Sequence, residues 1–196
     1  MKRSAALFLC SAVGLWAAQG RFTISPATDT EFALEVTKTG LLSGKKHHLV
    51  FPGYSGVLVY DEAAPESSTV EIKVQTGNVQ VLDTWISDKD REKVRQYATE
   101  KELEAAKFPE ITFRSNSVRK VSERRFTVEG PLTIRSTTRP VAVTVDIEPS
   151  SSSGYKFTGS ARFKLSEFQL ERPKAALGTI GTADEVTVMF RLVAHR

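Results

Sequence analysis

The sequence predicts an all-β domain, an antiparallel sandwich or barrel that carries one helical insert. Apolar and polar residues alternate with period two in many short segments, and turn-forming residues separate these segments at nearly regular spacing. Only residues 87–107 show a helical pattern. The length of 196 residues, an apolar fraction of 40% and a charged fraction of 26% fit one folded domain.

Residues 1–20 have the three-part layout of a secretory signal peptide. A basic head, Lys2-Arg3, precedes an almost continuously apolar run, and Ala18-Gln19-Gly20 supplies the small residues of a cleavage site. A buried helix or membrane anchor is the alternative, but the run is shorter than a bilayer span requires. We expect cleavage after Gly20 and a periplasmic or secreted domain over residues 21–196.

Removal of the signal peptide changes the charge and the cysteine count. The basic residues fall from 27 to 25 and the acidic residues stay at 23, so the net charge falls from +4 to +2. This balance gives no indication of nucleic-acid binding. The one cysteine, Cys10, is lost with the signal peptide, which excludes an internal disulfide and a cysteine metal site.

The expected strands follow from alternation along the chain. Residues 49–60 read as two strands or one bent strand, because Pro52-Gly53 interrupts them. Breaks are expected at Gly77-Asn78, at Gly130-Pro131 and in the polar run 150–154. The other predicted strands fall at 32–36, 70–74, 111–113, 126–128, 141–147, 155–165 and 186–192.

Residues 87–107 interrupt the strand pattern with helix-forming residues. Val94, Tyr97 and Ala98 recur at helical spacing, which predicts a helix over 87–98. Thr99 followed by Glu102 has the form of a capping box, so a kink and a second short helix over 100–107 are expected. Phe108-Pro109 should end the insert, since proline lacks the backbone donor.

Five collinear motifs resemble the YceI-like family across essentially the whole mature chain. The resemblance implies an extended, lipocalin-like antiparallel β-barrel of about eight strands, which is usually exported. It also implies a long apolar tunnel associated with polyisoprenoid chains, such as those of isoprenoid quinones. The motifs are G-V-L-V-Y-D at 56–61, K-F-P-E-I-T-F-R-S at 107–115, G-P-L-T-I at 130–134, T-R-P-V at 138–141 and D-E-V-T-V at 184–188.

A barrel that binds such a lipid would line its interior with alternate apolar side chains. The same alternation is typical of a filled β core, so both interpretations stay open for each residue. If the resemblance holds, we expect the cavity to be lined by Phe32, Leu34, Leu58, Ile72, Phe113, Val143, Phe157, Phe163, Val188 and Phe190.

No motif indicates catalysis, a bound metal or a cofactor. His47 and His48 are adjacent on a predicted strand, so their side chains should point to opposite faces and should not ligate one metal. The segment 53–56 lacks the spacing of a nucleophile elbow, and 178–181 matches neither a dinucleotide fingerprint nor a P-loop. We therefore expect a non-enzymatic protein without cofactor.

The predicted function is that of an exported protein that sequesters or carries a long-chain isoprenoid lipid. Transient contact with a membrane surface is a second expectation, because basic residues cluster at predicted strand ends and could attract anionic head groups. The alternatives are a filled-core β protein that acts as a stress-related or complex-assembly partner, and a hydrolase-like enzyme. The basic residues are Lys45, Lys46, Arg124, Arg125, Arg135 and Arg139.

Overall fold

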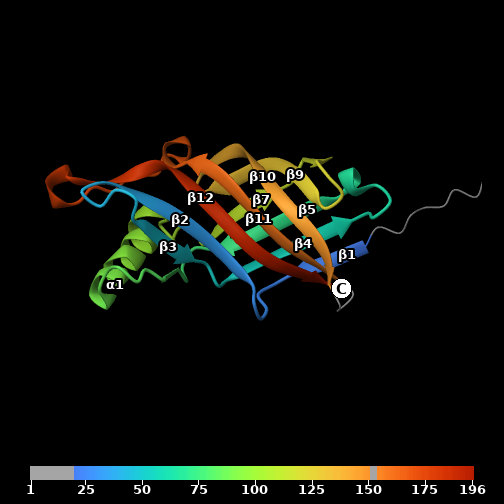
Figure 1. Cartoon of the computed structure of the whole chain (residues 1–196), viewed down its shortest axis with the longest axis horizontal. Helices are drawn as coiled ribbons and strands as arrows, with labels where there is room; N and C mark the ends of the chain where they lie inside the picture. Colours follow the sequence, from blue (N-terminus) through green and yellow to red (C-terminus); the bar gives the residue numbers. More distant parts are fainter. Residues whose placement is uncertain (1–19, 151–153) are drawn as a thin grey trace, which may run out of the picture.

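The computed structural model describes residues 20–150 and 154–196 and consists mainly of antiparallel strands (Figure 1). The predicted signal peptide lies outside these residues, except for Gly20. None of the helices in the described part of the chain is long and apolar enough to cross a membrane. The strands are β1 Gly20–Ile24, β2 Glu31–Gly40, β3 Lys46–Val50, β4 Tyr54–Tyr60, β5 Thr69–Gln75, β6 Gln80–Val81, β7 Glu110–Arg114, β8 Ser117–Lys120, β9 Arg125–Ile134, β10 Thr137–Ser150, β11 Gly154–Lys164 and β12 Ile180–His195.

Eight of the strands form a closed ring, in the order β1-β4-β5-β7-β9-β10-β11-β12. The ring closes where β12 pairs with β1, through Thr23 opposite His195 and Ile24 opposite Ala194. Every pairing in the ring is antiparallel. The prediction of an antiparallel barrel of about eight strands is therefore confirmed.

A second set of strands extends the sheet beyond the closed ring at one end of the barrel. The stretch of β12 from Ile180 to Arg191 pairs with β2 instead of β1, and β2 continues the sheet through β3 to β6. Figure 1 shows helix α1 beside β3 at this end, and β1 with the C-terminus at the opposite end. The expected interruption at Pro52-Gly53 separates β3 from β4, which pair with different neighbours.

The helical insert differs from the predicted one at its second half. Helix α1, Asp88–Gln96, begins after Ser87, whose hydroxyl accepts a hydrogen bond from the Asp90 backbone at 3.2 Å. The chain then continues directly into a π-helical turn over Tyr97–Glu102, so the predicted kink and second helix over 100–107 are wrong. Thr99 caps nothing, because its hydroxyl donates backward to the Arg95 carbonyl at 3.0 Å.

The predicted strand break at Gly130-Pro131 is also wrong, because both residues lie inside β9. On one edge of β9, β8 pairs with residues 126–129 and β7 pairs with Leu132 and Thr133. Pro131 lies between the residues that pair with β8 and those that pair with β7, so its missing backbone donor breaks no hydrogen bond between strands on this edge. A Cβ on Gly130 would lie 2.0 Å from the Arg114 carbonyl oxygen, so this close approach requires glycine.

Three 3₁₀ turns complete the fold, η1 at Pro65–Ser67, η3 at Leu165–Phe168 and η4 at Ala176–Gly178. Turn η1 lies beside β8, at the end of the barrel where β1 begins, and the Lys120 backbone donates there to the Glu66 carboxylate. Turn η3 buries Phe168 against Phe163, with ring centroids 5.0 Å apart. Turn η3 therefore belongs to the packed core, whereas η1 has no buried residue.

Candidate functional site

The ring encloses a cavity of about 140 Å³ whose wall is almost entirely apolar. All eight strands of the ring contribute to the wall, together with β2, β8 and η1. The side chains with a polar atom along the wall belong to Tyr60, Ser68 and Thr69. A cavity without charged groups suits a hydrocarbon ligand, because it offers no compensation for a buried charge.

Seven of the ten predicted residues lie along this wall. The remaining three, Leu34, Phe163 and Val188, lie outside it. The seven are Phe32, Leu58, Ile72, Phe113, Val143, Phe157 and Phe190. The structure adds apolar residues that the predicted set omitted: Ile24, Pro65, Val70, Val118, Phe126, Val128, Val145, Ile147 and Leu192.

A stacked pair of phenyl rings explains why three predicted residues lie elsewhere. Phe32 and Phe190 are directly paired across β2 and β12, with ring centroids 6.1 Å apart and planes 12° apart. Leu34 and Val188 form the next inward pair along the same two strands and do not reach the cavity. The pair Phe32–Phe190 therefore forms the floor of the cavity.

Beyond this floor the barrel is filled by its own side chains. Phe163 packs there against Phe168, which is 1% exposed, and Val186 on the neighbouring strand is equally buried. Leu49 of β3 and Val81 of β6 are buried in the same cluster. The filled and the hollow interpretations of the sequence thus describe two different halves of one barrel.

A second, more polar cavity of about 290 Å³ lies at the end of the barrel where β1 begins. We call it the vestibule. Tyr60 belongs to the walls of both cavities, so it stands between them. The vestibule is lined by Gly20, Phe22, Tyr60, Asp61, Glu62, Ala63, Tyr155 and Arg196.

Two tyrosines and a carboxylate contact one another in the vestibule. The Tyr155 hydroxyl donates a hydrogen bond to Glu62, and the rings of Tyr155 and Tyr60 meet edge to face at 4.8 Å. Burial, followed by the contact with Glu62, raises the pKa of Tyr155 to about 12. Burial and the nearby Glu62 and Asp61 also raise the pKa of Tyr60, so both phenols are neutral donors at physiological pH.

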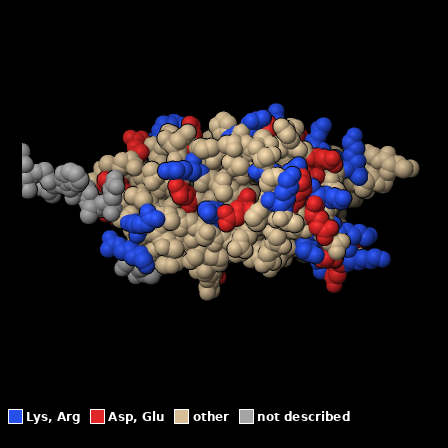
Figure 2. All heavy atoms as spheres, turned by 180° about the vertical axis from the view of Figure 1, so that it is seen from behind, with Lys and Arg blue, Asp and Glu red and all other residues tan. Residues whose placement is uncertain are grey.

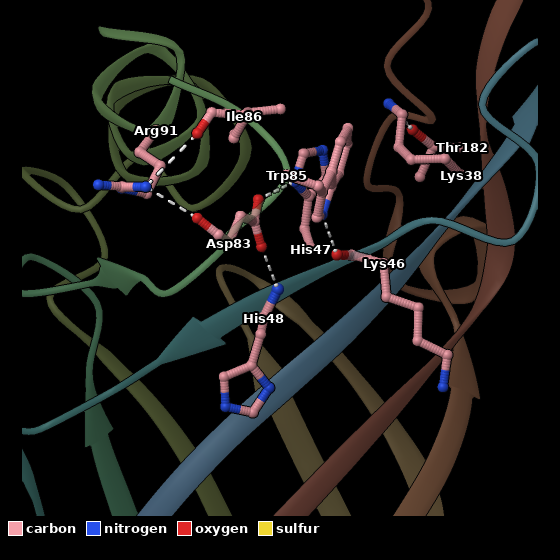
Figure 3. Close-up of polar contacts among 9 residues, drawn as sticks. All are labelled: Lys38, Lys46, His47, His48, Asp83, Trp85, Ile86, Arg91 and Thr182. Atoms are coloured by element: carbon pink, nitrogen blue, oxygen red, sulfur yellow. Dashed lines mark hydrogen bonds and ion pairs between the residues drawn. The ribbon is translucent and has the colours of Figure 1, made fainter. Parts of the chain in front are cut away.

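A polar cluster at the opposite end anchors the helical insert (Figure 3). The Asp83 side chain is fully buried and lies 2.5 Å from His47 Nδ1, and it accepts a hydrogen bond from the His48 backbone at 2.8 Å. Arg91 of α1 donates to the Asp83 carbonyl at 2.9 Å. The cluster therefore ties β3, the segment after β6 and helix α1 together.

The two histidines point to opposite faces of β3, as expected. His47 lies against the indole of Trp85 (Figure 3), whereas His48 Nε2 lies 3.6 Å from Glu31. Trp85 does not belong to the cavity wall, so its fluorescence would report poorly on a ligand there. Within residues 20–150 and 154–196, no three side chains of the His, Cys, Asp or Glu type gather as metal ligands would.

The clustered basic residues do not meet at one opening. Strand register places Arg125 opposite Asp146, toward the end that holds the cavity, and an ion pair of 2.8 Å joins the two. Lys46 lies opposite Thr37, toward the filled end, and Arg135 lies in the turn between β9 and β10. The basic residues of the prediction are therefore distributed over both ends of the barrel.

Comparison with known proteins identifies relatives of the whole fold. Residues 22–194 match the YceI-like domain family. A UPF0312 protein of Pseudomonas savastanoi pv. phaseolicola is 27% identical over 135 residues, which cover 64% of this chain and 65% of that protein. A UPF0312 protein of Pseudomonas putida W619 is 25% identical over 138 residues, which cover 68% of each chain. The first alignment thus spans less than two thirds of the relative's length.

Solved structures agree with this assignment at the level of the fold. BcnA of Burkholderia cenocepacia superimposes with a TM-score of 0.67 at 19% identity, covering 84% of this chain and 95% of BcnA. A polyisoprenoid-binding domain from Saccharophagus degradans, implicated in plant cell wall breakdown, gives a TM-score of 0.60 at 14% identity, covering 91% and 99%. Since the family match spans nearly all described residues, the chain belongs to the YceI-like domain family.

Proposed function

We propose that this protein binds a long-chain isoprenoid lipid in its barrel cavity and carries or sequesters it without chemical change. The observation that carries the proposal is the closed ring of strands around an apolar cavity. The fold shared with the polyisoprenoid-binding domain of Saccharophagus degradans supports the ligand class. An isoprenoid chain suits this wall, because it is apolar along its whole length and needs no hydrogen-bond partner.

The energetics favour reversible binding. Each buried carbon contributes about 0.8 kcal/mol relative to water, so one five-carbon unit contributes about 3–4 kcal/mol before ordering costs. A membrane already keeps the chain out of water. Transfer from a bilayer into the barrel is therefore close to neutral, which suits a carrier or reservoir better than an irreversible trap.

The size of the cavity limits how much of a lipid it holds without rearrangement. An engineered protein cavity of about 150 Å³ holds one benzene molecule. The cavity of about 140 Å³ is therefore large enough for roughly one isoprene unit. A longer chain requires the floor formed by Phe32 and Phe190 to move, or must extend outward through the vestibule.

Export and membrane contact are part of the same proposal. The signal-peptide layout of residues 1–20 supports export to the periplasm or medium. N-terminal sequencing of the protein from a periplasmic fraction tests it, and an intact Met1 on protein retained in the cytoplasm would refute it.

The filled end of the barrel, opposite the vestibule, supports contact with an anionic membrane. Leu41 and Leu177 are 79% and 107% exposed on two loops that are joined by a 3.0 Å hydrogen bond from the Leu41 backbone to Thr179. Neither loop, 39–46 or 172–183, contains a carboxylate, although both contain Lys or Arg. Figure 2 shows a projecting uncharged tip at this end with Lys and Arg side chains next to it. Basic side chains gain about 1 kcal/mol each near an anionic surface.

Extraction of the purified protein tests the proposed function directly. We expect organic extraction and mass spectrometry to recover about one prenyl lipid per protein chain. The matched control is a variant in which the cavity is filled, Val143→Phe, which should yield much less. Equal lipid from both proteins, or none from either, would favour the filled-core alternative of a protein-interaction partner.

A further inference from the structure

We propose that the vestibule binds the head group of the lipid and selects an uncharged, hydrogen-bonding group, a hydroxyl or carbonyl, over a phosphate. The inference rests on the proposed function, because it assumes that an apolar chain occupies the neighbouring cavity. The vestibule is more polar than the cavity, and Tyr60 belongs to the walls of both.

Tyr60 is placed to hold a head group at the boundary. Its ring borders the apolar cavity on one side and the vestibule on the other. Within residues 20–150 and 154–196 no protein group forms a hydrogen bond with its hydroxyl, whereas the hydroxyl of Tyr155 is committed to Glu62. The Tyr60 phenol is thus available to donate to an oxygen of the ligand.

The position of Tyr60 also fixes which way the lipid would lie. Leu58 precedes Tyr60 by two residues on β4, so both side chains are on the inward face of the same strand. Leu58 and its partner Val70 on β5 belong to the cavity wall. A head group bound at Tyr60 therefore directs the first isoprene units past Leu58 toward the Phe32–Phe190 floor.

Glu62 complements the phenol as an acceptor. A carboxylate has two oxygens and can accept several hydrogen bonds, so accepting from Tyr155 does not exhaust Glu62. A ligand hydroxyl between Tyr60 and Glu62 can accept from the phenol and donate to the carboxylate. A ligand carbonyl can use the phenol alone.

The charges of the vestibule oppose a phosphorylated head group. Asp61 and Glu62 contribute two carboxylates, and Arg196 contributes one guanidinium, which lies over the Phe22 ring at 5.7 Å. Asp61 is held in place by the backbone donors of Ala63 and Ala64 at 2.9 and 3.0 Å. Phosphate sites instead surround the anion with several cationic or backbone donors. Among the side chains that line the vestibule the carboxylates outnumber the guanidinium, which favours neutral head groups.

The test compares head groups on one chain length. A polyprenol, a prenylquinone and a polyprenyl phosphate of equal chain length compete against a fluorescent prenyl probe, and squalene serves as the hydrocarbon without a head group. We expect the neutral polar lipids to bind tightest and the phosphate roughly tenfold more weakly. The protein purified from its native cell fraction and delipidated is used throughout.

Two variants and one control locate the effect. Tyr60→Phe keeps the ring and should weaken the binding of the polyprenol and the prenylquinone roughly threefold to tenfold. It should leave the affinity for squalene unchanged. Glu62→Gln removes one negative charge and should improve phosphate binding. Tyr97→Phe, which removes a phenol hydroxyl in the helical insert, should change neither the affinity for the neutral lipids nor the affinity for the phosphate.

The outcomes separate this inference from the proposed function. If squalene binds but the polyprenyl phosphate binds as tightly as the neutral polar lipids or more tightly, the head-group inference is wrong and the lipid-binding proposal stands. The same conclusion follows if Tyr60→Phe leaves all affinities equal. If neither the prenyl probe nor any of the competing prenyl compounds binds, both proposals are wrong.

Discussion

Filling the cavity with one additional ring tests whether the barrel is hollow where the structure places the cavity. Val143 lies on the inward face of β10, opposite Val128 on β9 and Ala161 on β11. The small side chain of Ala161 leaves room beside it. Because the cavity of about 140 Å³ has the size of one that holds benzene, a phenyl ring at position 143 fits the space.

The expected effect of Val143→Phe is a gain in stability and a loss of lipid. The substitution adds four side-chain carbons, which contribute at most about 3 kcal/mol at about 0.8 kcal/mol per buried carbon. Ordering of the new side chain and imperfect fit reduce this gain, so we expect roughly 1–2 kcal/mol. For a domain of this size that corresponds to a rise in Tm of roughly 2–8 °C.

Calorimetry of the delipidated protein measures the stability, and mass spectrometry of extracted lipid measures occupancy. Thr144→Phe is the matched control, because the exposed Thr144 side chain points outward from the same strand. It should change neither quantity much. A fall in Tm equivalent to about 1–3 kcal/mol, the usual cost of overpacking, would refute the hollow interior.

Three further predictions concern other parts of the molecule. Replacing Leu41 and Leu177 together with Ser should reduce flotation with anionic vesicles and leave lipid content unchanged; equal flotation would exclude this end as the membrane contact. Asp83→Asn should destabilise the protein by about 1.5–3 kcal/mol in chemical denaturation and speed amide exchange in α1, since it replaces the buried side chain that accepts from the His48 backbone and contacts the His47 ring; unchanged exchange would show that the insert is anchored elsewhere. The folded-state pKa of Tyr155, about 12, exceeds its unfolded value of about 10, so its contribution to stability is complete below pH 10 and lost as pH rises toward 12. Tyr155→Phe should therefore lose less stability between pH 10 and 12, and an unchanged loss would contradict the assignment.

Strands with one inward and one outward face could be predicted from alternation alone. The predicted sets at 70–74, 141–147 and 186–192 fall within β5, β10 and β12. Strands β1, β6 and β8 were not predicted. Strands β6 and β8 have only two and four residues and offer too few alternating positions, and β1 begins at the expected cleavage site of the signal peptide. The closure of the ring through β1 could therefore not be read from the sequence.

The two incorrect local predictions have a common cause. Pro131 normally interrupts a strand and Thr99 normally favours a helix start, but both statements assume local control of the backbone. At Pro131 the change of partner strand on one edge of β9 removes the need for a donor. At Thr99 the incoming helix continues, so the hydroxyl bonds to the preceding turn. Tertiary pairing and helix continuation, neither visible in a short motif, decided both cases.

The boundary between hollow and filled barrel could not be predicted for a related reason. Phe32 and Leu34 have the same alternation and similar hydrophobicity, yet only Phe32 borders the cavity. The difference arises from neighbours that are distant in sequence. Beside Leu34 lie β3 and the core around Phe168, whereas beside Phe32 the ring closes through the short β1 and leaves space.

The same boundary determines how chain length would affect binding. A first isoprene unit fits the existing cavity, but each further unit that moves inward must part the stacked rings of Phe32 and Phe190. Separating such a pair costs about 0.5–1.5 kcal/mol beyond the lost apolar contact. The side chains that fill the barrel beyond the floor must also move, at a cost of about 1–3 kcal/mol. One additional unit transferred from water contributes about 3–4 kcal/mol, which offsets these costs, whereas the same unit transferred from a bilayer contributes close to nothing. The floor would therefore open only for a chain taken up from water, and would stay closed against a chain held by a membrane or by another protein.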